Sequence, residues 1–257
     1  MNVRLAALLA FLAAAVCHPL RAETAGHWIA KARAYLGSEE ALNSVSTIHF
    51  SGMLEVAGLT PAADVKSGAA DMVERFPAEI VFQKPYQQQM TVTRPTSIDS
   101  MVLDDYDGWS RTVARDNPKA ANVTLLETEQ IKQLRANTWE ILSFHAGLEK
   151  RGGTVQVDGE DEVVDGILCA KVSFVHSERI VFHRYFDKAT GRLVKTETAN
   201  GSEIREEGEI IVDGIRFPKR IVNKAPSGQV TTIVVEKVVL NEPYPSSAFA
   251  VPSLTVE

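Results

Sequence analysis

Between residues 48 and 240 the chain alternates apolar and polar residues over many short segments, with turn-forming pairs between them. A period of two is typical of β-strands, because successive side chains point to opposite faces of a sheet. Asp-Gly between two apolar runs is among the strongest local signals for a β-hairpin. The pattern therefore predicts an antiparallel meander whose turns carry Asp165-Gly166, Thr190-Gly191, Asp213-Gly214 and Ser227-Gly228.

The expected strands fall into two groups on either side of one long helix. Pro77, Pro85, Pro95 and Asp107-Gly108 mark breaks in the first group. That many strands cannot lie in one flat open sheet without curling. The first group is expected over residues 48–56, 69–75, 79–84, 87–94, 97–104 and 108–114, and the second over 154–157, 167–175, 179–186, 193–198, 203–212, 215–223 and 229–240.

Three helices complete the expected fold. Helical spacing from Trp28 to Leu36 predicts a helix ended by Gly37, and Ser38 can cap a short second helix ending near residue 43. Residues 125–153 predict a longer helix, whose stripe contains Ile131, Leu134, Thr138, Ile141, Leu142, His145 and Leu148, widened by Trp139 and Phe144. The expected fold class is α+β, mainly β. It is a strongly curved antiparallel sheet or incomplete β-barrel with helices covering the concave face.

Two strands are apolar on both faces, which an antiparallel sheet does not need if one face meets water. Tight packing on both sides would explain this, and so would an apolar cavity between the sheet and a helix. In the first strand, alternation puts Leu168, Ala170, Val172 and Phe174 on one face, opposite Cys169 and Val175. In the second it puts Val230, Val234 and Val238 on one face, opposite Ile233, Val235 and Val239.

The N-terminus has the pattern of a secretory signal peptide over residues 1–22. Arg4 precedes an apolar run that is too short to span a bilayer comfortably, and small or apolar residues surround the expected cleavage point after Ala22. Lipoprotein anchoring through Cys17 is not expected, because Val16 stands where a small residue is required. We expect the remainder, residues 23–257, to form one domain that is not an integral membrane protein.

Cleavage would remove two arginines and no acid, which changes the net charge from −6 to −8. Such an acidic chain is a poor partner for nucleic acid. It would also leave Cys169 as the only cysteine, so no intramolecular disulfide is expected.

No catalytic motif is present. The sequence lacks His-Glu-x-x-His, Gly-x-Ser-x-Gly, a glycine-rich phosphate loop and a calcium loop. His176 and His183 are expected on neighbouring strands, where they are either half a metal site or ordinary solvated histidines. Cys169 lies within an apolar strand, which suits an inert thiol. We therefore expect no catalytic residue, metal or cofactor, and no enzyme.

The segment YFDKATGRLVKTET, residues 185–198, contains polar groups that could belong to a site. Its apolar residues alternate on both sides of a polar turn. Asp187 can accept hydrogen bonds from backbone amides, and Gly191 can adopt a positive φ. We interpret it as the tip of a hairpin.

Four segments, in this order and spacing, resemble the LolA/LolB-like superfamily, in particular periplasmic outer-membrane lipoprotein-sorting proteins. The resemblance covers essentially all of the chain after residue 22. The segments are YLGSEEALNSVSTIHFSGML (35–54), Asp107-Gly108-Trp109, residues 185–198 followed by EGEIIVDGIRFPKRIV (207–222), and VEKVVLNEPYPSSAFAVP (235–252).

The resemblance implies a half-barrel closed by helices, whose apolar cavity holds the acyl chains of a lipoprotein or another lipid without catalysis. An arginine that latches the helical lid is also implied, with Arg75 and Arg94 as candidates. The residues expected to contact the ligand are Phe50, Leu54, Trp109, Leu134, Trp139, Ile141 and Phe144.

The leading hypothesis is therefore a periplasmic carrier or binding protein for lipoproteins or lipids. An envelope sensor or protein-interaction module with the same fold, docking a membrane-anchored partner, is the alternative. A secreted hydrolase with an unrecognised carboxylate pair is a third hypothesis.

Overall fold

A computed structural model describes residues 24–57 and 73–252 of the chain. The described residues contain fourteen strands, all in one antiparallel sheet. The strands are β1 (Thr47–Ala57), β2 (Val73–Gln83), β3 (Gln87–Thr93), β4 (Ser97–Asp104), β5 (Asp107–Ala114), β6 (Ala121–Leu125), β7 (Thr154–Val157), β8 (Glu162–Val164), β9 (Ile167–Ser177), β10 (Ile180–Asp187), β11 (Leu193–Thr198), β12 (Glu203–Val212), β13 (Ile215–Lys224) and β14 (Val230–Leu240).

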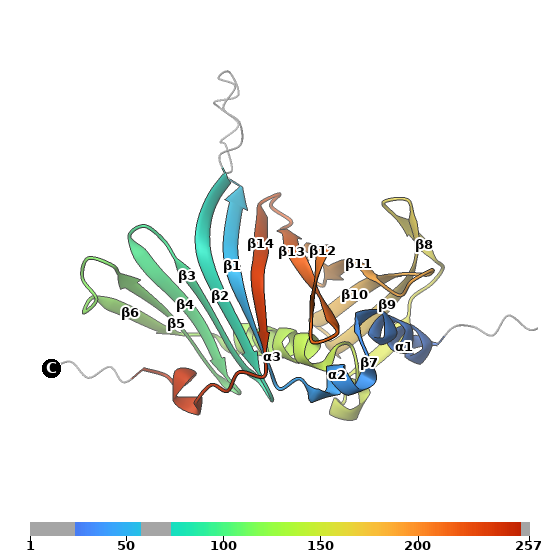
Figure 1. Ribbon diagram of the computed structural model, residues 1–257, viewed down its shortest axis with the longest axis horizontal. Helices are drawn as coiled ribbons and strands as arrows, with labels where there is room; N and C mark the ends of the chain where they lie inside the picture. The colour runs from blue at the N-terminus through green and yellow to red at the C-terminus, as the bar shows by residue number, and fades with distance from the viewer. Residues whose placement is uncertain (1–23, 58–72, 253–257) are drawn as a thin grey trace, which may run out of the picture.

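The sheet consists of two meanders joined at its centre. From β6 to β1 each strand pairs with its neighbour in sequence, and the same holds from β14 to β9, where β7 and the short β8 also pair. The first and last strands, β1 and β14, join the two halves, with Ile48 opposite Leu240. The sheet curves around the long helix and stays open, with β6 and β7 far apart (Figure 1). The predicted fold class, a curved antiparallel sheet with helices on its concave side, is confirmed.

The two N-terminal helices are α1 (Ala25–Leu36) and α2 (Glu39–Ser44). Gly37 ends α1, and the Ser38 hydroxyl accepts a hydrogen bond from the backbone amide of Ala41, as the sequence predicted. The long helix α3 (Thr128–Ser143) crosses the concave side of the sheet (Figure 1). Two short 3₁₀ turns, Glu149–Arg151 and Ser246–Ala248, follow later in the chain.

The helix α3 is shorter than predicted at both ends. It begins after a capping box formed by Glu127 and Gln130. It ends at Ser143, because Phe144 and His145 adopt positive φ values of 49° and 70°. His145 therefore leaves the helical stripe in which the sequence placed it.

The strand β2 runs without a break through Pro77, where two separate strands were predicted. The strand β3 pairs only with Ala78 to Gln83, so at Pro77 one side of β2 is unpaired. Proline is tolerated at such an edge position because no partner strand requires its missing N–H. Part of the predicted segment 69–75 lies outside the described residues, and β6 and β8 were not predicted.

A β-bulge interrupts the pairing of β1 with β14. Ser51 pairs with Lys237 but Gly52 pairs with Val235, which leaves one extra residue in β14. The shift brings Val235 and Val238 into the same core cluster as Ile233. The strict alternation predicted for residues 230–239 was therefore wrong, since it put Val235 and Val238 on opposite faces.

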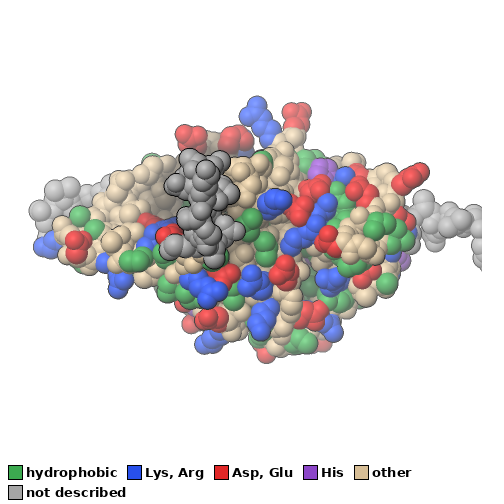
Figure 2. Space-filling view, turned by 90° about the horizontal axis from the view of Figure 1, so that it is seen from above, with side chains coloured by type: hydrophobic (Ala, Val, Ile, Leu, Met, Phe, Trp, Pro, Cys, Tyr) green, Lys and Arg blue, Asp and Glu red, His purple; other side chains and the backbone are tan. Residues whose placement is uncertain are grey.

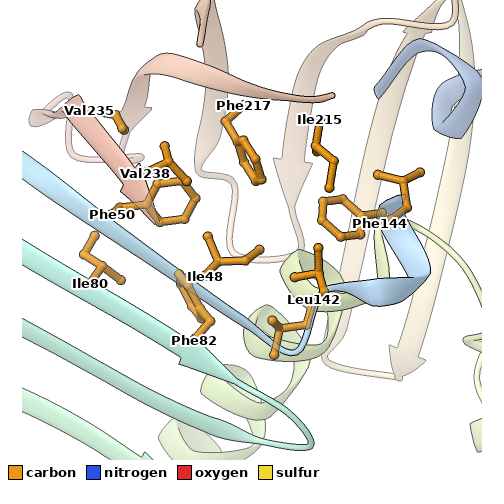
Figure 3. Packing of buried hydrophobic residues seen from close by; sticks show 12 residues of the cluster. Ile48, Phe50, Ile80, Phe82, Leu142, Phe144, Ile215, Phe217, Val235 and Val238 are labelled. Atoms are coloured by element: carbon orange, nitrogen blue, oxygen red, sulfur yellow. The ribbon is translucent and has the colours of Figure 1, made fainter. Parts of the chain in front are cut away.

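The largest core cluster fills the space between the centre of the sheet, α2 and the end of α3 (Figure 3). The rings of Phe50 and Phe217 lie 5.8 Å apart, and Phe144 approaches Phe217 from α3 at 6.4 Å, each pair edge to face. Such aromatic pairs stabilise a core beyond their buried area. They anchor the end of α3 to the concave face.

Candidate functional site

A cavity of about 310 Å³ lies between the concave face of the sheet and α3. Its walls come from both halves of the sheet, so it spans the centre where β1 and β14 meet. Most of the wall is aliphatic or aromatic, including Ile48, Phe50, Ile80, Phe82, Ile141, Phe144, Phe182, Phe217, Ile221 and Ile233. Its size is at the lower end of the range typical of small-molecule sites.

A groove of about 340 Å³ adjoins the cavity beside α1 and the β10–β11 turn. Its outer wall includes Tyr35, Arg192 and Glu209. Glu206, Arg216 and five other residues line both spaces, so the groove and the cavity are contiguous. On the face drawn in Figure 2, acidic and basic side chains are interspersed with hydrophobic ones over the surface.

One wall of the cavity carries a buried charge cluster. Glu140 of α3 accepts a hydrogen bond from Nη1 of Arg184 on β10, and its second oxygen lies 2.6 Å from Nε2 of His176 on β9. Burial opposes ionisation of Glu140, but Arg184 and His176 outweigh it and lower the pKa of this carboxyl to about 2. The cluster fixes α3 to the second half of the sheet.

His145 completes this cluster as a neutral acceptor. Its Nδ1 lies 2.9 Å from Nη1 of Arg184, which donates. Burial, followed by the charge of Arg184, lowers the pKa of His145 to about 3. The left-handed backbone after α3 thus places a neutral imidazole against the guanidinium.

Glu206 on β12 has a different environment. It is half-buried and lines the cavity, yet among the described residues it has no hydrogen bond or ion pair. Burial raises the pKa of this carboxyl, and the charge of Arg184 offsets the effect only in part. The cavity therefore contains a carboxyl that ionises less readily than an ordinary glutamate.

Two further contacts hold α3 in place. Thr138 donates to the side-chain oxygen of Gln88 on β3 at 3.1 Å, which ties α3 to the first half of the sheet. Arg33 of α1 donates to the carbonyl oxygens of Ser143 and Phe144 at 2.8 and 3.1 Å. These carbonyls belong to the last turn of α3, where helical partners are missing.

Arg33 is the arginine that donates to the backbone at the end of the long helix. The two candidates from the sequence have other partners, since Nε of Arg75 lies 3.0 Å from Glu55 and Nε of Arg94 lies 2.9 Å from Asp99. Both pairs lie in the first half of the sheet. The arginine that meets the last turn of α3 is therefore on α1 and is neither of the two candidates.

The predicted ligand-contacting residues separate into groups. Phe50, Ile141 and Phe144 line the cavity. Trp139 instead lines a smaller hollow on the other side of α3, where the guanidinium of Arg151 stacks on it at 4.0 Å. Leu54 packs farther along β1, in a cluster with Phe76, Ala78 and Val92, and Leu134 is a half-buried residue of α3 outside the cavity wall.

Trp109 lies on the opposite face of the sheet from the cavity. It packs with Val81, whose neighbours Ile80 and Phe82 face the cavity. Its Nε1 donates to the backbone oxygen of Phe249 at 3.0 Å. This contact joins two of the segments that carried the resemblance, since the C-terminal segment covers the tryptophan of Asp107-Gly108-Trp109.

Sequence reasoning missed Glu140, Arg184 and Glu206. A signal was available for the first two, because each is a charged residue within an otherwise apolar run, WEIL and VFHRYF. Charged residues are almost never fully buried unless they are paired. The position of Glu206 depends on the register of β12, which the sequence alone does not determine.

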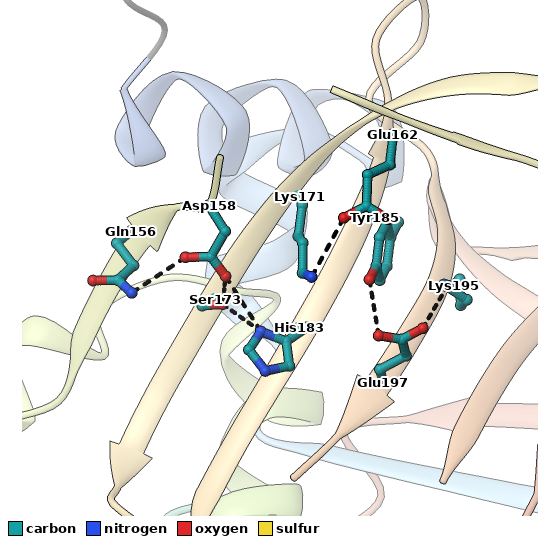
Figure 4. A network of polar contacts seen from close by, with 9 residues as sticks. All are labelled: Gln156, Asp158, Glu162, Lys171, Ser173, His183, Tyr185, Lys195 and Glu197. Carbon is teal, nitrogen blue, oxygen red and sulfur yellow. Dashed lines mark hydrogen bonds and ion pairs between the residues drawn. The ribbon is translucent and has the colours of Figure 1, made fainter. Parts of the chain in front are cut away.

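A serine, a histidine and an aspartate meet on the other face of β9 and β10 (Figure 4). Nδ1 of His183 lies 2.5 Å from Oγ of Ser173 and 3.3 Å from Asp158, and Ser173 also donates to Asp158. A catalytic triad needs the serine and the acid on different ring nitrogens. Here both contact the same nitrogen, so the histidine cannot relay a proton from one to the other.

The two strand histidines do not form a joint site. They lie on neighbouring strands as predicted, but His176 contacts Glu140 while His183 contacts Ser173 and Asp158. His176 is largely buried, which corrects the prediction of a solvated residue. Within residues 24–57 and 73–252, no group of three metal-ligating side chains is arranged to hold an ion.

Cys169 and the hairpin tip have structural roles. Cys169 is buried, and burial, with a smaller effect of Asp187, raises the pKa of its thiol. Asp187 accepts hydrogen bonds from the amide of Ala189 at 2.8 Å and the hydroxyl of Thr190 at 2.6 Å. Gly191 adopts φ 83°, so the turn has the geometry predicted from its sequence.

No helix in the described part of the chain is long and apolar enough to cross a membrane. No protein-family model matches the sequence, and no curated protein matches it. Its architecture is nevertheless similar to solved structures. A LolA superfamily protein from Nitrosomonas europaea is 14% identical, with a TM-score of 0.57 over 88% of this chain and 97% of that chain.

A DUF1329 family protein from Desulfovibrio piger is 11% identical, with a TM-score of 0.54 over the same shares of the two chains. At such low identities the likeness concerns the fold alone. It agrees with the resemblance that the four sequence segments indicated. The chain therefore has the LolA-like fold.

Proposed function

We propose that the protein is a non-enzymatic carrier or binding protein for the acyl chains of lipids or lipoproteins, which it holds in the cavity between the sheet and α3. The observation that carries this proposal is the cavity of about 310 Å³, walled mainly by aliphatic and aromatic side chains and open to a groove. Each methylene moved from water to such a wall contributes about 0.8 kcal/mol. Apolar lining is therefore sufficient for affinity, and no reacting group is required.

The proposal includes the cellular location. Residues 1–22, which lie outside the described residues, have the pattern of a signal peptide, and a LolA-like domain over residues 23–257 would then act in the periplasm. The role would be lipoprotein sorting or lipid transfer toward the outer membrane. A soluble carrier is needed there because acyl chains do not cross an aqueous compartment unaided.

Binding of an uncharged fluorescent probe such as N-phenyl-1-naphthylamine, and its displacement by acyl lipids, tests the proposal. We expect the purified protein to bind the probe, and native mass spectrometry to detect co-purified lipid. Absence of both lipid and probe binding in folded protein would refute the proposal.

A matched pair of variants tests whether the probe binds in the cavity. Ile221 lines the cavity, so Ile221→Trp should fill part of it and weaken probe binding about tenfold or more. Ile211 of β12 is 62% exposed, so Ile211→Trp adds the same side chain outside and should bind as the wild type does. Equal binding by both variants would place the site elsewhere.

A further inference from the structure

Two groups in the cavity wall lack partners within the protein. Nε of Arg184 is buried without a hydrogen-bond partner, although its Nη1 binds Glu140 and His145. The carboxyl of Glu206 has no partner among the described residues either. Buried polar groups are nearly always hydrogen-bonded, so the buried Nε of Arg184 in the wall of a cavity indicates an occupant that supplies the missing partner, and the half-buried carboxyl of Glu206 offers a second polar contact in the same wall.

The register of the sheet puts both groups on the same face. Arg184 pairs with Thr196, and Thr196 pairs with Ile204, so these three residues form a row across β10, β11 and β12. Glu206 follows two residues after Ile204 and shares its face. All four residues line the cavity, and Thr196 contributes a further hydroxyl to the wall that contains Arg184 and Glu206.

The chemistry of the pair specifies its partner. Nε of Arg184 can only donate a hydrogen bond, and the carboxyl of Glu206 donates one when it is protonated. Two donors on one wall match an acceptor with two oxygen atoms. The rest of the wall is mainly apolar, as at Phe50, Phe82 and Ile233. Its other polar residues include Gln88, Asn137 and Arg216.

We propose that the cavity binds a single-chain amphiphile with its carboxyl head group inside, one oxygen at Nε of Arg184 and the other at the carboxyl of Glu206, and its hydrocarbon chain along Phe50, Phe82 and Ile233. The proposal rests on the proposed function, since it assumes that this cavity is the binding site. The ligand carboxyl and Glu206 share one proton, so the pair carries a single negative charge facing Arg184.

This arrangement discriminates between head groups. A methyl ester has no charge to place against Arg184, and an alcohol offers one oxygen instead of two. A primary amine brings a positive charge toward Arg184 and is disfavoured. Long-chain carboxylic acids are therefore the preferred ligand class.

The test is displacement of N-phenyl-1-naphthylamine from delipidated protein by four ligands with the same chain: hexadecanoic acid, methyl hexadecanoate, hexadecan-1-ol and hexadecylamine. We expect the acid to bind about tenfold or more tightly than the methyl ester, because its hydrogen bonds involve a charged group. The amine should bind least well.

Variants connect this preference with the two residues. Glu206→Leu should reduce the acid-to-ester ratio toward one. Glu206→Gln keeps a donor and should retain part of the ratio. Ile204→Val, in the same strand, is the control and should change both affinities alike, with circular dichroism checking the fold of each variant.

The outcomes separate the two proposals. Equal binding of acid and ester by the wild type, or an unchanged ratio in Glu206→Leu, overturns the head-group proposal and leaves the carrier function standing. If none of the four ligands displaces the bound probe, the head-group proposal is wrong. If the probe does not bind and no lipid co-purifies, both proposals are wrong.

Discussion

Glu140 of α3 and Arg184 of β10 form a buried ion pair in which each carboxylate oxygen has its own partner, since the second oxygen contacts His176. The side chains of Glu140 and Arg184 are only 3% and 9% exposed. This pair is one of the contacts between the helix and the second half of the sheet. It also forms part of the cavity wall.

Glu140→Gln should destabilise the fold by about 3 kcal/mol, because it leaves the charge of Arg184 buried without a counter-ion. Chemical denaturation followed by tryptophan fluorescence measures the free energy of unfolding. Glu129→Gln is the control on the same helix, since its pair with Lys132 is exposed and should change stability by less than about 0.5 kcal/mol. A loss below about 1 kcal/mol in Glu140→Gln would contradict the prediction.

The pKa of His145 predicts sensitivity to acid. Its folded-state pKa of about 3 is below the ordinary 6.5, so between these values the unfolded chain binds a proton that the folded chain excludes. Stability should therefore fall as the pH drops from 6.5 toward 3, by about 2 kcal/mol between pH 6.5 and 5 from this group alone.

Denaturation curves at several pH values test this effect. His145→Gln keeps an acceptor for Arg184 and should flatten the dependence between pH 6.5 and 5, whereas the exposed His27→Gln should follow the wild type. Glu206 acts with the opposite sign, because its raised pKa favours the folded state at low pH and that contribution is lost as the pH rises. If stability depends on pH in the same way in the wild type and in His145→Gln, the assignment to His145 is refuted.

Arg33 should control the end of α3. Arg33→Gln removes the donors to the carbonyls of Ser143 and Phe144, and it also removes the guanidinium that lowers the pKa of Glu39. We expect about 2 kcal/mol of destabilisation and faster amide hydrogen exchange in the last turn of α3.

The control for this change is Arg75→Gln, because Arg75 is 66% exposed and pairs with Glu55 on the neighbouring strand. It should leave exchange in α3 unchanged. Faster exchange in both variants, or in neither, would show that Arg33 does not hold the helix end.

Gly52 should tolerate no side chain. A Cβ at this position would lie 1.9 Å from the carbonyl oxygen of Val234, at the bulge between β1 and β14. Gly52→Ala should therefore cost about 3 kcal/mol or more, which a thermal melt would show as a fall of about 6–12 °C. Gly26→Ala is the matched control, since Gly26 is exposed in α1 and a helical alanine is neutral or favourable there.

The fold could be predicted from the sequence wherever local chemistry determines structure. The turns at Asp165-Gly166 and Asp213-Gly214 have the positive φ values that the Asp-Gly signal requires, and Gly37 and Ser38 end and begin helices as expected. The strand break predicted at Pro77 was wrong, because the effect of a proline in a strand depends on whether a third strand pairs at that point. This is a property of the whole sheet.

The candidate site was less predictable for the same reason. Apolar residues such as Phe50 and Ile141 could be assigned to the concave side from periodicity, and both line the cavity. The polar residues of the wall could not be predicted in this way, because Glu140 and Arg184 become neighbours only when α3 packs against β10. The faces of β14 also depend on a bulge that is imposed by its pairing with β1.

The pairing of β1 with β14 has a consequence for how the molecule is made. Every other neighbouring pair in the main strand order from β6 to β9 is consecutive in sequence and can form locally. The strand β1 instead pairs with the distant β14, with Ile48 opposite Leu240. During vectorial synthesis, one edge of β1 therefore stays open until β14 has emerged. Such long-range closure slows folding and leaves an edge exposed to wrong partners. The long-range pairing of β1 with β14 is thus also the pairing that joins the two walls of the cavity.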